Sequence, residues 1–214
     1  KDPTADVEGY DACRKIAILT SLVCGQQVDF HDIHTEGITK ISASDIKYAA
    51  KMGRSIKLLA SSRKTRDGYQ AMVAPFMLSP AHPLYNVNDV FNAVFVRGNV
   101  LGDAMFYGSG AGKLPTASAV VADMIDIAKH LDSNIWVEWS SKKLTLSDFK
   151  EAENVFFVRT SSGKEIIEKV FGSVDYIDAG IEGECGFVTE CMTEDVFAEK
   201  ASEIKALSVI RVGK

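Results

Sequence analysis

Two carboxylates and a lysine stand close together near the start of the sequence. Asp6, Asp11 and Lys15 lie in the stretch Asp6-Val-Glu-Gly-Tyr-Asp11-Ala-Cys-Arg-Lys15. Residues four apart on a helix share one face, with Cβ atoms about 5–6 Å apart, so Asp11 and Lys15 are expected to be neighbours. Such a group could line a polar cavity, with Lys15 as proton donor and acceptor. Burial disfavours the charge of a lysine whereas a nearby carboxylate favours it, and the sequence does not decide which effect is larger.

A plain ion pair is the alternative interpretation of Asp11 and Lys15. Asp11 falls in the first turn of the expected helix, near the positive end of the helix dipole. Ion pairs at this spacing are common and contribute only about 0.2–0.5 kcal/mol each. The rest of the helix, residues 16–24 before Gly25, is apolar nearly all round, which predicts that the helix is buried. Charged side chains at the start of a buried helix need a reason, and on the residues alone the ion pair and the chemical role both stay open.

Further motifs make the first 132 residues resemble homoserine dehydrogenase. The set, in the order of that family, is Asp2-Pro-Thr-x-Asp6-Val-Glu-Gly-Tyr-Asp11-x-x-Arg-Lys15, Glu36-Gly-Ile38, Ile56-Lys-Leu-Leu-Ala60, His82-Pro-Leu84, Asn92-Ala-Val94 and Tyr107-Gly-x-Gly-Ala-Gly112-x-x-Pro-Thr-Ala-Ser-Ala-Val120. The resemblance implies NAD(P)-dependent interconversion of L-homoserine and L-aspartate 4-semialdehyde. It also implies that Lys15 is the catalytic lysine, that Asp11 binds and orients the substrate, and that Asp6 pairs with the substrate's ammonium group.

The glycine turn Gly108-x-Gly110-x-Gly112 is not a nucleotide-binding motif by its spacing. The dinucleotide fingerprint needs two residues between its second and third glycines and a surrounding βαβ unit, so a plain tight turn is the simpler interpretation. A helix is expected to follow from Pro115, a favourable first helical residue. The family resemblance implies more, namely that Gly110 and Gly112 approach the NAD or NADP cofactor.

The sequence lacks the other half of such an enzyme. No Gly-x-Gly-x-x-Gly fingerprint occurs in it. The resemblance places the main nucleotide-binding half upstream of Lys1, together with a substrate-binding glutamate, a second lysine and a monovalent-cation site. We therefore expect a C-terminal fragment of a longer homoserine dehydrogenase, which neither binds NAD(P) tightly nor turns over. The choice between NAD and NADP stays open, because the residue that reads the ribose 2′ position belongs to that half.

The expected fold is α+β, with an antiparallel or mixed-sheet substrate domain that has helices on one face. Residues 1–133 form the substrate, catalytic and dimerisation domain with a returning nucleotide-domain helix, and residues 134–154 form a connector. The elements expected in the first part are helices at 10–24 and 43–52, the latter capped by Ser42 or Ser44, and strands at 55–64, 69–78, 91–97 and 102–108. Asp67-Gly68 is expected to form the turn between the first two of these strands.

Residues 155–214 show the strand and helix order of a split βαβ unit. The expected elements are strand 155–160, helix 163–172, strand 174–180, strand 185–191, helix 194–205 and strand 207–212. This βαββαβ order resembles a ferredoxin-like ACT domain, a module that commonly senses amino acids. An effector such as threonine would then bind at the first strand–helix junction, Thr160-Ser161-Ser162-Gly163. The alternative for this segment is a purely structural or dimerising ferredoxin-like unit. The alternative for the whole chain is a non-catalytic module that dimerises and senses threonine or a related amino acid through this ACT-like segment.

Composition indicates a globular protein of one or two domains. The chain has 214 residues, a net charge of −5 and 46% hydrophobic residues. Mild acidity gives no reason to expect nucleic acid as a partner. No apolar run approaches the ~20 residues that cross a bilayer, so no membrane partner is expected. We expect a cytoplasmic homo-dimer or higher homo-oligomer.

No metal site is expected from the candidate ligands. The cysteines are scattered without metal-ligand spacing and are expected to be reduced thiols, at positions Cys13, Cys24, Cys185 and Cys191. A second group could be mistaken for a metal site but is expected to be loop residues, namely His31, Asp32, His34 and Glu36.

Overall fold

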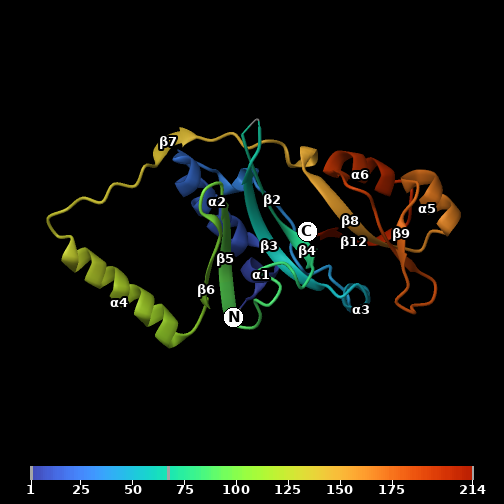
Figure 1. The fold of residues 1–214 in the computed structure, drawn as a ribbon, viewed down its shortest axis with the longest axis horizontal. Helices are drawn as coiled ribbons and strands as arrows, with labels where there is room; N and C mark the ends of the chain where they lie inside the picture. Colours follow the sequence, from blue (N-terminus) through green and yellow to red (C-terminus); the bar gives the residue numbers. More distant parts are fainter. Residues whose placement is uncertain (1, 67, 214) are drawn as a thin grey trace. The chain divides into compact units, whose positions relative to one another are not determined.

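A computed structural model describes residues 2–66 and 68–213 (Figure 1). The chain forms two compact units, one of residues 1–79 together with 138–214, and one of Pro80–Val137. Asp67 of the expected hairpin turn lies outside the described residues. The two strands that flank it pair in antiparallel register up to Lys64 opposite Tyr69, as the turn prediction requires.

The first unit begins with the helices that carry the acidic residues. Its first elements are α1 (Thr4–Val7), α2 (Tyr10–Cys24), β1 (Gln26–Gln27), η1 (Phe30–Asp32), β2 (His34–Thr35), α3 (Ala43–Lys51), β3 (Ser55–Lys64) and β4 (Tyr69–Leu78). Gly9 and Gly25 flank α2, both with a left-handed backbone, at φ of 78° and 67°. Ser42 caps α3 in a capping box with Asp45. Local signals of this kind account for the agreement of α2 and α3 with the expected bounds. β3 and β4 also have the expected bounds.

The same unit continues with the C-terminal segment. Its elements are β7 (Ser140–Lys143), η2 (Phe149–Glu151), β8 (Glu153–Thr160), α5 (Lys164–Phe171), β9 (Asp175–Ile177), β10 (Cys185–Val188), β11 (Met192–Thr193), α6 (Glu194–Ala201) and β12 (Ala206–Val212). The expected order of strand, helix, strand, strand, helix, strand is observed, with β11 added. β9 is shorter than expected because Gly180 has a left-handed backbone and its amide bonds to Asp178 Oδ1 at 2.8 Å, which turns the chain.

One mixed sheet joins both segments of this unit. Its strands lie in the order β2-β4-β12-β8-β10-β9, with β3 paired to β4 and β11 to β8. β12 runs parallel to β4 and antiparallel to β8. Strands from opposite ends of the chain therefore share hydrogen bonds, and the expected α+β class with a mixed sheet is observed. Strands of this sheet come from both sides of the connector expected at residues 134–154. The division of the chain into separate domains stays a prediction.

Helices cover both faces of this sheet. Tyr48 of α3 packs with Phe157 of β8, whereas Phe197 of α6 stacks on Phe156 of the same strand at 3.8 Å between ring centroids. Side chains alternate across a strand, so α3 lies on one face and α6, with α5, on the other (Figure 1). On β4, Val73 packs against α2.

The expectation that α2 is buried all round is wrong. Its buried residues recur at helical spacing on one face, at Cys13, Ile16, Ala17, Thr20 and Ser21. Ile18, Leu22 and Val23 lie on the other face and are 52%, 45% and 74% exposed. Apolar residues on all sides of a helix predict burial on all sides, but only one face of α2 packs against the sheet.

The second unit contains two strands and a long helix. β5 (Phe91–Gly98) and β6 (Gly102–Ser109) pair in antiparallel register, and α4 spans Lys113–Lys129. α4 begins two residues before the expected Pro115, with Gly112 as its N-cap residue. None of the α4 residues that the structure describes is buried. No helix within the described ranges is long and apolar enough to cross a membrane.

Candidate active site

Asp11 and Lys15 form the ion pair that their spacing predicts. Lys15 Nζ lies 2.6 Å from Asp11 Oδ2, and the two side chains are 62% and 47% exposed. Both residues lie in the first two turns of α2, whose opposite face is fixed to the sheet through Cys13 and Ile16. The helix therefore presents a carboxylate and an ammonium group together to an incoming molecule. At this exposure both groups are open to solvent.

Asp6 lies on α1, immediately before this helix. Its side chain is exposed, and its backbone carbonyl accepts a bond from the Gly9 amide at 3.2 Å. The left-handed backbone of Gly9 lets the chain pass from α1 directly into α2. A Cβ atom at Gly9 would also lie 3.1 Å from Val73 of β4. Glycine at this position thus holds the acidic segment close against the sheet.

The Glu36-Gly-Ile38 segment connects α1 to β4 through backbone hydrogen bonds. The Glu36 amide donates to Val73 O at 2.8 Å, and the Ile38 amide donates to Val7 O at 2.7 Å. A Cβ atom at Gly37 would collide with the Val7 carbonyl and lie 2.6 Å from Glu8 Cα. Only glycine allows the two backbones to approach this closely. The second motif of the sequence therefore supports the first, from a separate stretch of chain.

Glu36 belongs to a buried ion cluster with residues of the C-terminal segment. Arg211 of β12 donates from Nη1 and Nη2 to Glu36 at 3.0 and 2.7 Å. It also donates from Nε and Nη2 to Glu194 of α6 at 2.6 and 2.8 Å. His34 Nε2 lies 2.6 Å from Glu36 Oε1, and its ring stacks on Phe149. His34 and Glu36 were both expected to lie in a loop. His34 is instead the first residue of β2, and Glu36 directly follows the last one.

The charges of this cluster stabilise one another. Burial on its own would raise the pKa of Glu36, but the hydrogen bonds from His34 and Arg211 and the positive charge of Arg211 lower it to about 2. Burial opposes the charge of Arg211, yet the bonds to Glu194 and Glu36 raise its pKa. Both groups are therefore charged near neutral pH.

Replacing Glu36 with glutamine is expected to destabilise the fold in a pH-dependent way. The folded pKa of about 2 lies below the ordinary value of 4.5, so the carboxylate's contribution is full above about pH 4.5 and is lost as the pH falls toward 2. Near pH 7 we expect a loss of about 1–2 kcal/mol, at the lower end for charged hydrogen bonds because the Glu36 side chain is 38% exposed. Urea unfolding at about pH 7 and pH 3 measures it.

A neutral control is Glu182→Gln, on an exposed side chain before β10. The gap in unfolding free energy between wild type and Glu36→Gln should narrow at the lower pH, whereas Glu182→Gln should stay close to wild type at both. An equal gap at both pH values would show that the charge of Glu36 does not stabilise the fold.

Sequence reasoning missed Arg211 and Glu194. Glu36 belongs to the Glu36-Gly-Ile38 motif and to the group expected to be loop residues, and neither prediction pairs it with an arginine. One signal was available, because Arg211 interrupts the apolar run Val209-Ile-Arg-Val212 and a charged side chain in a central strand needs a partner. The identity of that partner could not be read from local pattern.

The two cofactor candidates lie in the second unit, whereas Asp6, Asp11 and Lys15 lie in the first. The Gly110 amide donates to Val90 O at 2.9 Å, and a Cβ atom at Gly110 would collide with the Asn92 side chain. Gly112 has φ of 122° and precedes α4. The backbone conformation at Gly112 therefore favours glycine, whereas a side chain at Gly110 would require Asn92 to move. This geometry is that of a tight turn, the simpler interpretation of the glycine spacing. The backbone of residues 109–112 is exposed to solvent just before the N-terminus of α4.

The four effector candidates are brought together, largely by bonds within the chain. Thr160 Oγ1 donates to Lys205 O at 2.8 Å, the Lys205 amide donates to Ser162 Oγ at 2.9 Å, and the Ser161 amide donates to Lys205 O at 3.3 Å. Gly163 follows as the N-cap residue of α5. These bonds tie the turn after β8 to the start of β12.

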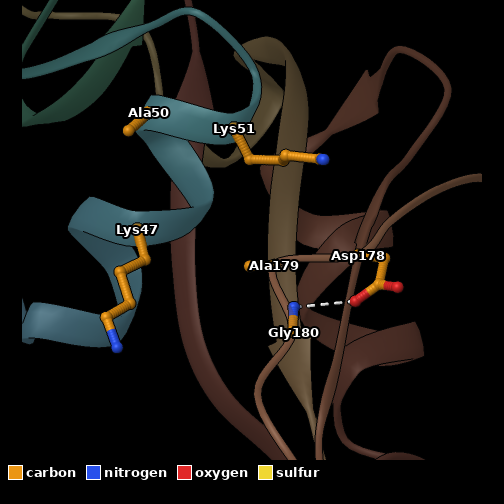
Figure 2. Close-up of a pocket in the computed structure, with 6 residues that line it drawn as sticks. All are labelled: Lys47, Ala50, Lys51, Asp178, Ala179 and Gly180. Carbon is orange, nitrogen blue, oxygen red and sulfur yellow. Dashed lines mark hydrogen bonds between the residues drawn. The ribbon is translucent and has the colours of Figure 1, made fainter.

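Two open cavities occur on the first unit. The larger, of about 560 Å³, lies between α3 and the loop after β9 and is lined by Lys47, Ala50, Lys51, Asp178, Ala179 and Gly180 (Figure 2). Figure 2 shows the two lysine ammonium groups pointing apart and the Asp178 carboxylate bonded to the Gly180 amide. The smaller, of about 260 Å³, is bordered by Glu36, Glu194 and Arg211. Neither contains Asp6, Asp11 or Lys15, so neither is the candidate active site.

Comparison with known proteins supports the motif assignment. A family model described as homoserine dehydrogenase matches residues 1–125. The homoserine dehydrogenase of Neisseria gonorrhoeae is 47% identical over 133 residues, which are 62% of this chain and 31% of that protein. The Synechocystis enzyme is 48% identical over 137 residues, covering 62% and 32%. The chain thus spans about a third of the length of these relatives.

Solved structures resemble the chain over its whole length. The homoserine dehydrogenase of Thiobacillus denitrificans matches with a TM-score of 0.86 and 26% identity, covering 100% of this chain and 55% of that one. The S. aureus enzyme at pH 7.5 matches with a TM-score of 0.77 and 29% identity, covering 99% and 55%. Since the family model matches more than half of the sequence, including all the motifs that carry the resemblance, the chain belongs to the homoserine dehydrogenase family.

Proposed function

We propose that this chain is the substrate-binding and proton-transfer part of an NAD(P)-dependent homoserine dehydrogenase, which interconverts L-homoserine and L-aspartate 4-semialdehyde. One observation carries the proposal: the Asp11–Lys15 pair, at 2.6 Å, lies inside the segment that matches the family model. A module that only senses amino acids would have no use for this pair. The match of residues 1–125 to a dehydrogenase model also disfavours that alternative.

The chain's own side chains have distinct roles in this reaction. As the neutral amine, Lys15 Nζ takes the proton of the substrate hydroxyl during oxidation, and as the ammonium it returns that proton during reduction. Asp11 fixes the lysine ammonium group by their ion pair and orients the substrate beside it. Asp6 supplies a second carboxylate for the substrate's ammonium group. Asp6 and Lys15 are exposed and the Asp11 side chain is 47% exposed, which leaves all three accessible to a small amino acid.

The nicotinamide cofactor supplies hydride transfer when bound. The glycine turn fits a partial contact with it, because Gly110 and Gly112 leave backbone uncovered before α4. The sequence holds no Gly-x-Gly-x-x-Gly unit, so the turn cannot make a complete nucleotide site. We therefore propose that a nucleotide-binding half precedes these 214 residues in the working enzyme, and that α4 packs within that half.

Homoserine-dependent reduction of NAD or NADP tests the proposal. The full-length protein that carries this sequence should reduce one of the nucleotides with homoserine, measured by the absorbance of the reduced nicotinamide. The 214 residues alone should show no turnover under the same conditions. A folded full-length protein that binds the nucleotide yet shows no homoserine-dependent reduction would refute the proposed function.

We further propose that residues 155–214 form an ACT-like regulatory domain, after the catalytic domain of residues 1–133 and the connector 134–154. The support is the antiparallel strand order β12-β8-β10-β9, with α5 and α6 on one face, which is the order of a split βαβ unit. The effector would be threonine or a related amino acid, bound beside Thr160-Ser161-Ser162-Gly163. Because Thr160 and Ser162 already bond to Lys205, it would have to displace bonds of that turn.

Saturating threonine is expected to stabilise the protein if this site exists. A ligand present at one hundred times its Kd adds about 2.7 kcal/mol to the free energy of unfolding, which thermal unfolding detects as a rise in Tm. Methionine, lysine and homoserine serve as comparison ligands. Ser162→Ala should reduce the effect of threonine, whereas Ser109→Ala, in the second unit, should not. No saturable rise with any of these ligands would argue against the sensor.

The assembly and location are also proposals. We propose a homo-dimer or higher homo-oligomer in the cytoplasm. The exposed apolar face of α2 favours further protein contacts, and the four cysteines are free thiols, as expected in a reducing compartment.

A further inference from the structure

Arg211 connects the last strand of the sheet to the segment that holds the acidic site. It is 5% exposed, and its guanidinium makes two bonds each to Glu36 and Glu194. Asn154 Nδ2 donates to Glu194 Oε1 at 2.7 Å, so Glu194 is also fixed to β8. Two bidentate carboxylate contacts fix the orientation of the Arg211 guanidinium, and the guanidinium in turn fixes the Glu36 carboxylate.

Glu36 transmits this orientation to α1. It is followed by Gly37, which touches the backbone of Val7 and Glu8, and by Ile38, whose amide bonds to Val7 O at 2.7 Å. Val7 is the residue after Asp6 and the last of α1. The path from Arg211 to the site therefore consists of two charged hydrogen bonds to Glu36, the close backbone contact at Gly37 and the hydrogen bond between Ile38 and Val7, all within one unit.

We infer that Arg211 is a positioning residue for the Asp6, Asp11 and Lys15 site, acting through Glu36 and the Glu36-Gly37-Ile38 segment. The inference rests on the proposed function and deepens it, because it makes β12 and α6 part of the substrate site's support. Without Arg211, Glu36 and Glu194 would be two carboxylates facing one another with no cation between them. Their repulsion would displace Glu36, and the backbone contact at Gly37 would carry that displacement to α1.

Arg159 offers a matched control for the loss of a buried arginine. It lies on β8 with its side chain 12% exposed, and it bonds to Asp45 at 3.0 Å and to Glu184 at 2.8 Å. Its third partner is Ser42 at the start of α3, at 3.1 Å. Arg159→Met therefore also leaves two carboxylates without their cation, but it acts on α3 and on the loop before β10 rather than on α1.

Hydrogen–deuterium exchange of the 214-residue chain tests the structural step without any activity. Arg211→Met should raise the exchange rate of peptides covering residues 4–11 and 36–41 by at least about tenfold relative to peptides of the β8 core. Arg159→Met should instead accelerate exchange around residues 42–46. Equal acceleration of all peptides in Arg211→Met, or none in 4–11, would overturn the inference.

Kinetics of the full-length enzyme test the functional step. Arg211→Met should raise the KM for homoserine about tenfold, equivalent to about 1.4 kcal/mol, while the KM for the nucleotide stays within about twofold. Arg211→Lys, which keeps the charge, should recover part of the loss, and Arg159→Met should leave the KM for homoserine unchanged. Unchanged homoserine kinetics in a folded Arg211→Met enzyme would overturn the inference. A wild-type enzyme without homoserine activity would refute the proposed function instead, and the exchange experiment would still decide the positioning role.

Discussion

Replacing Lys15 with alanine is expected to lower kcat/KM for homoserine by about 10²–10⁴-fold, the usual contribution of a positioned proton-transfer group. The side chain is 62% exposed and its ion pair with Asp11 is a surface i,i+4 pair, so the fold should lose only about 0.2–0.5 kcal/mol. The change should therefore separate chemistry from stability. Steady-state kinetics of the full-length enzyme, with circular dichroism of the same samples, measures both.

Lys47→Ala is the matched control for this substitution. Lys47 is likewise an exposed lysine on a helix of the first unit, on α3. It should leave kcat/KM within about twofold of wild type, since surface substitutions of this kind change stability by only about 0.5 kcal/mol. If Lys15→Ala kept a rate comparable to that of the control, Lys15 would have no part in proton transfer and the plain ion pair would be the correct interpretation.

Replacing Gly37 with alanine is expected to damage the substrate site through a steric clash, without removing any ionisable group. The added Cβ would collide with the Val7 carbonyl and lie 2.6 Å from Glu8 Cα, and backbone atoms cannot rotate away as a side chain can. We expect a loss of about 1–3 kcal/mol in the free energy of unfolding, typical of overpacking. Because relief requires α1 to move, the KM for homoserine should rise by about tenfold or more, since small misplacements are costly.

Gly98→Ala provides a control with room for the new methyl group. A Cβ atom at Gly98 would lie 3.6 Å from Leu101 Cβ, an ordinary contact, and its φ is not left-handed. Urea unfolding and the KM for homoserine should stay close to wild type in this variant. A Gly37→Ala enzyme with the homoserine KM of the control would show that the position of α1 does not matter for substrate binding.

Local signals accounted for most of the secondary structure of this chain. Strands 55–64 and 69–78 were predicted at their observed bounds, because their apolar pattern and the intervening turn are read within a few residues. The start and end of α2 followed from Tyr10 and Gly25 in the same way. Such signals depend on neighbours in sequence, and they are strongest where a cap or a left-handed glycine marks a boundary.

Pairings between distant segments could not be predicted on that basis. Nothing local indicates that β12 runs parallel to β4, since only Arg211 opposite Phe76 and Val212 opposite Met77 define the register. The same holds for the ion cluster, because Arg211 and Glu36 are 175 positions apart. The candidate site divides in the same manner: the Asp11–Lys15 pair is a local feature and was predicted, whereas the cluster beneath it was not.

The place of β12 in the sheet has a consequence for how the protein reaches its folded state. β12 is the last strand of the sheet in sequence order, yet it lies between β4 and β8. Until β12 pairs, no sheet hydrogen bonds connect β4 to β8. The edge of β4 at Phe76 and Met77, beyond its pairing with β2, is then unpaired and apolar. Pairing at such sequence distance is slow compared with the local closure of β3 on β4. Folding should therefore pass through a species with two separate half-sheets, in which chaperone binding or self-association at the edge of β4 competes with insertion of β12.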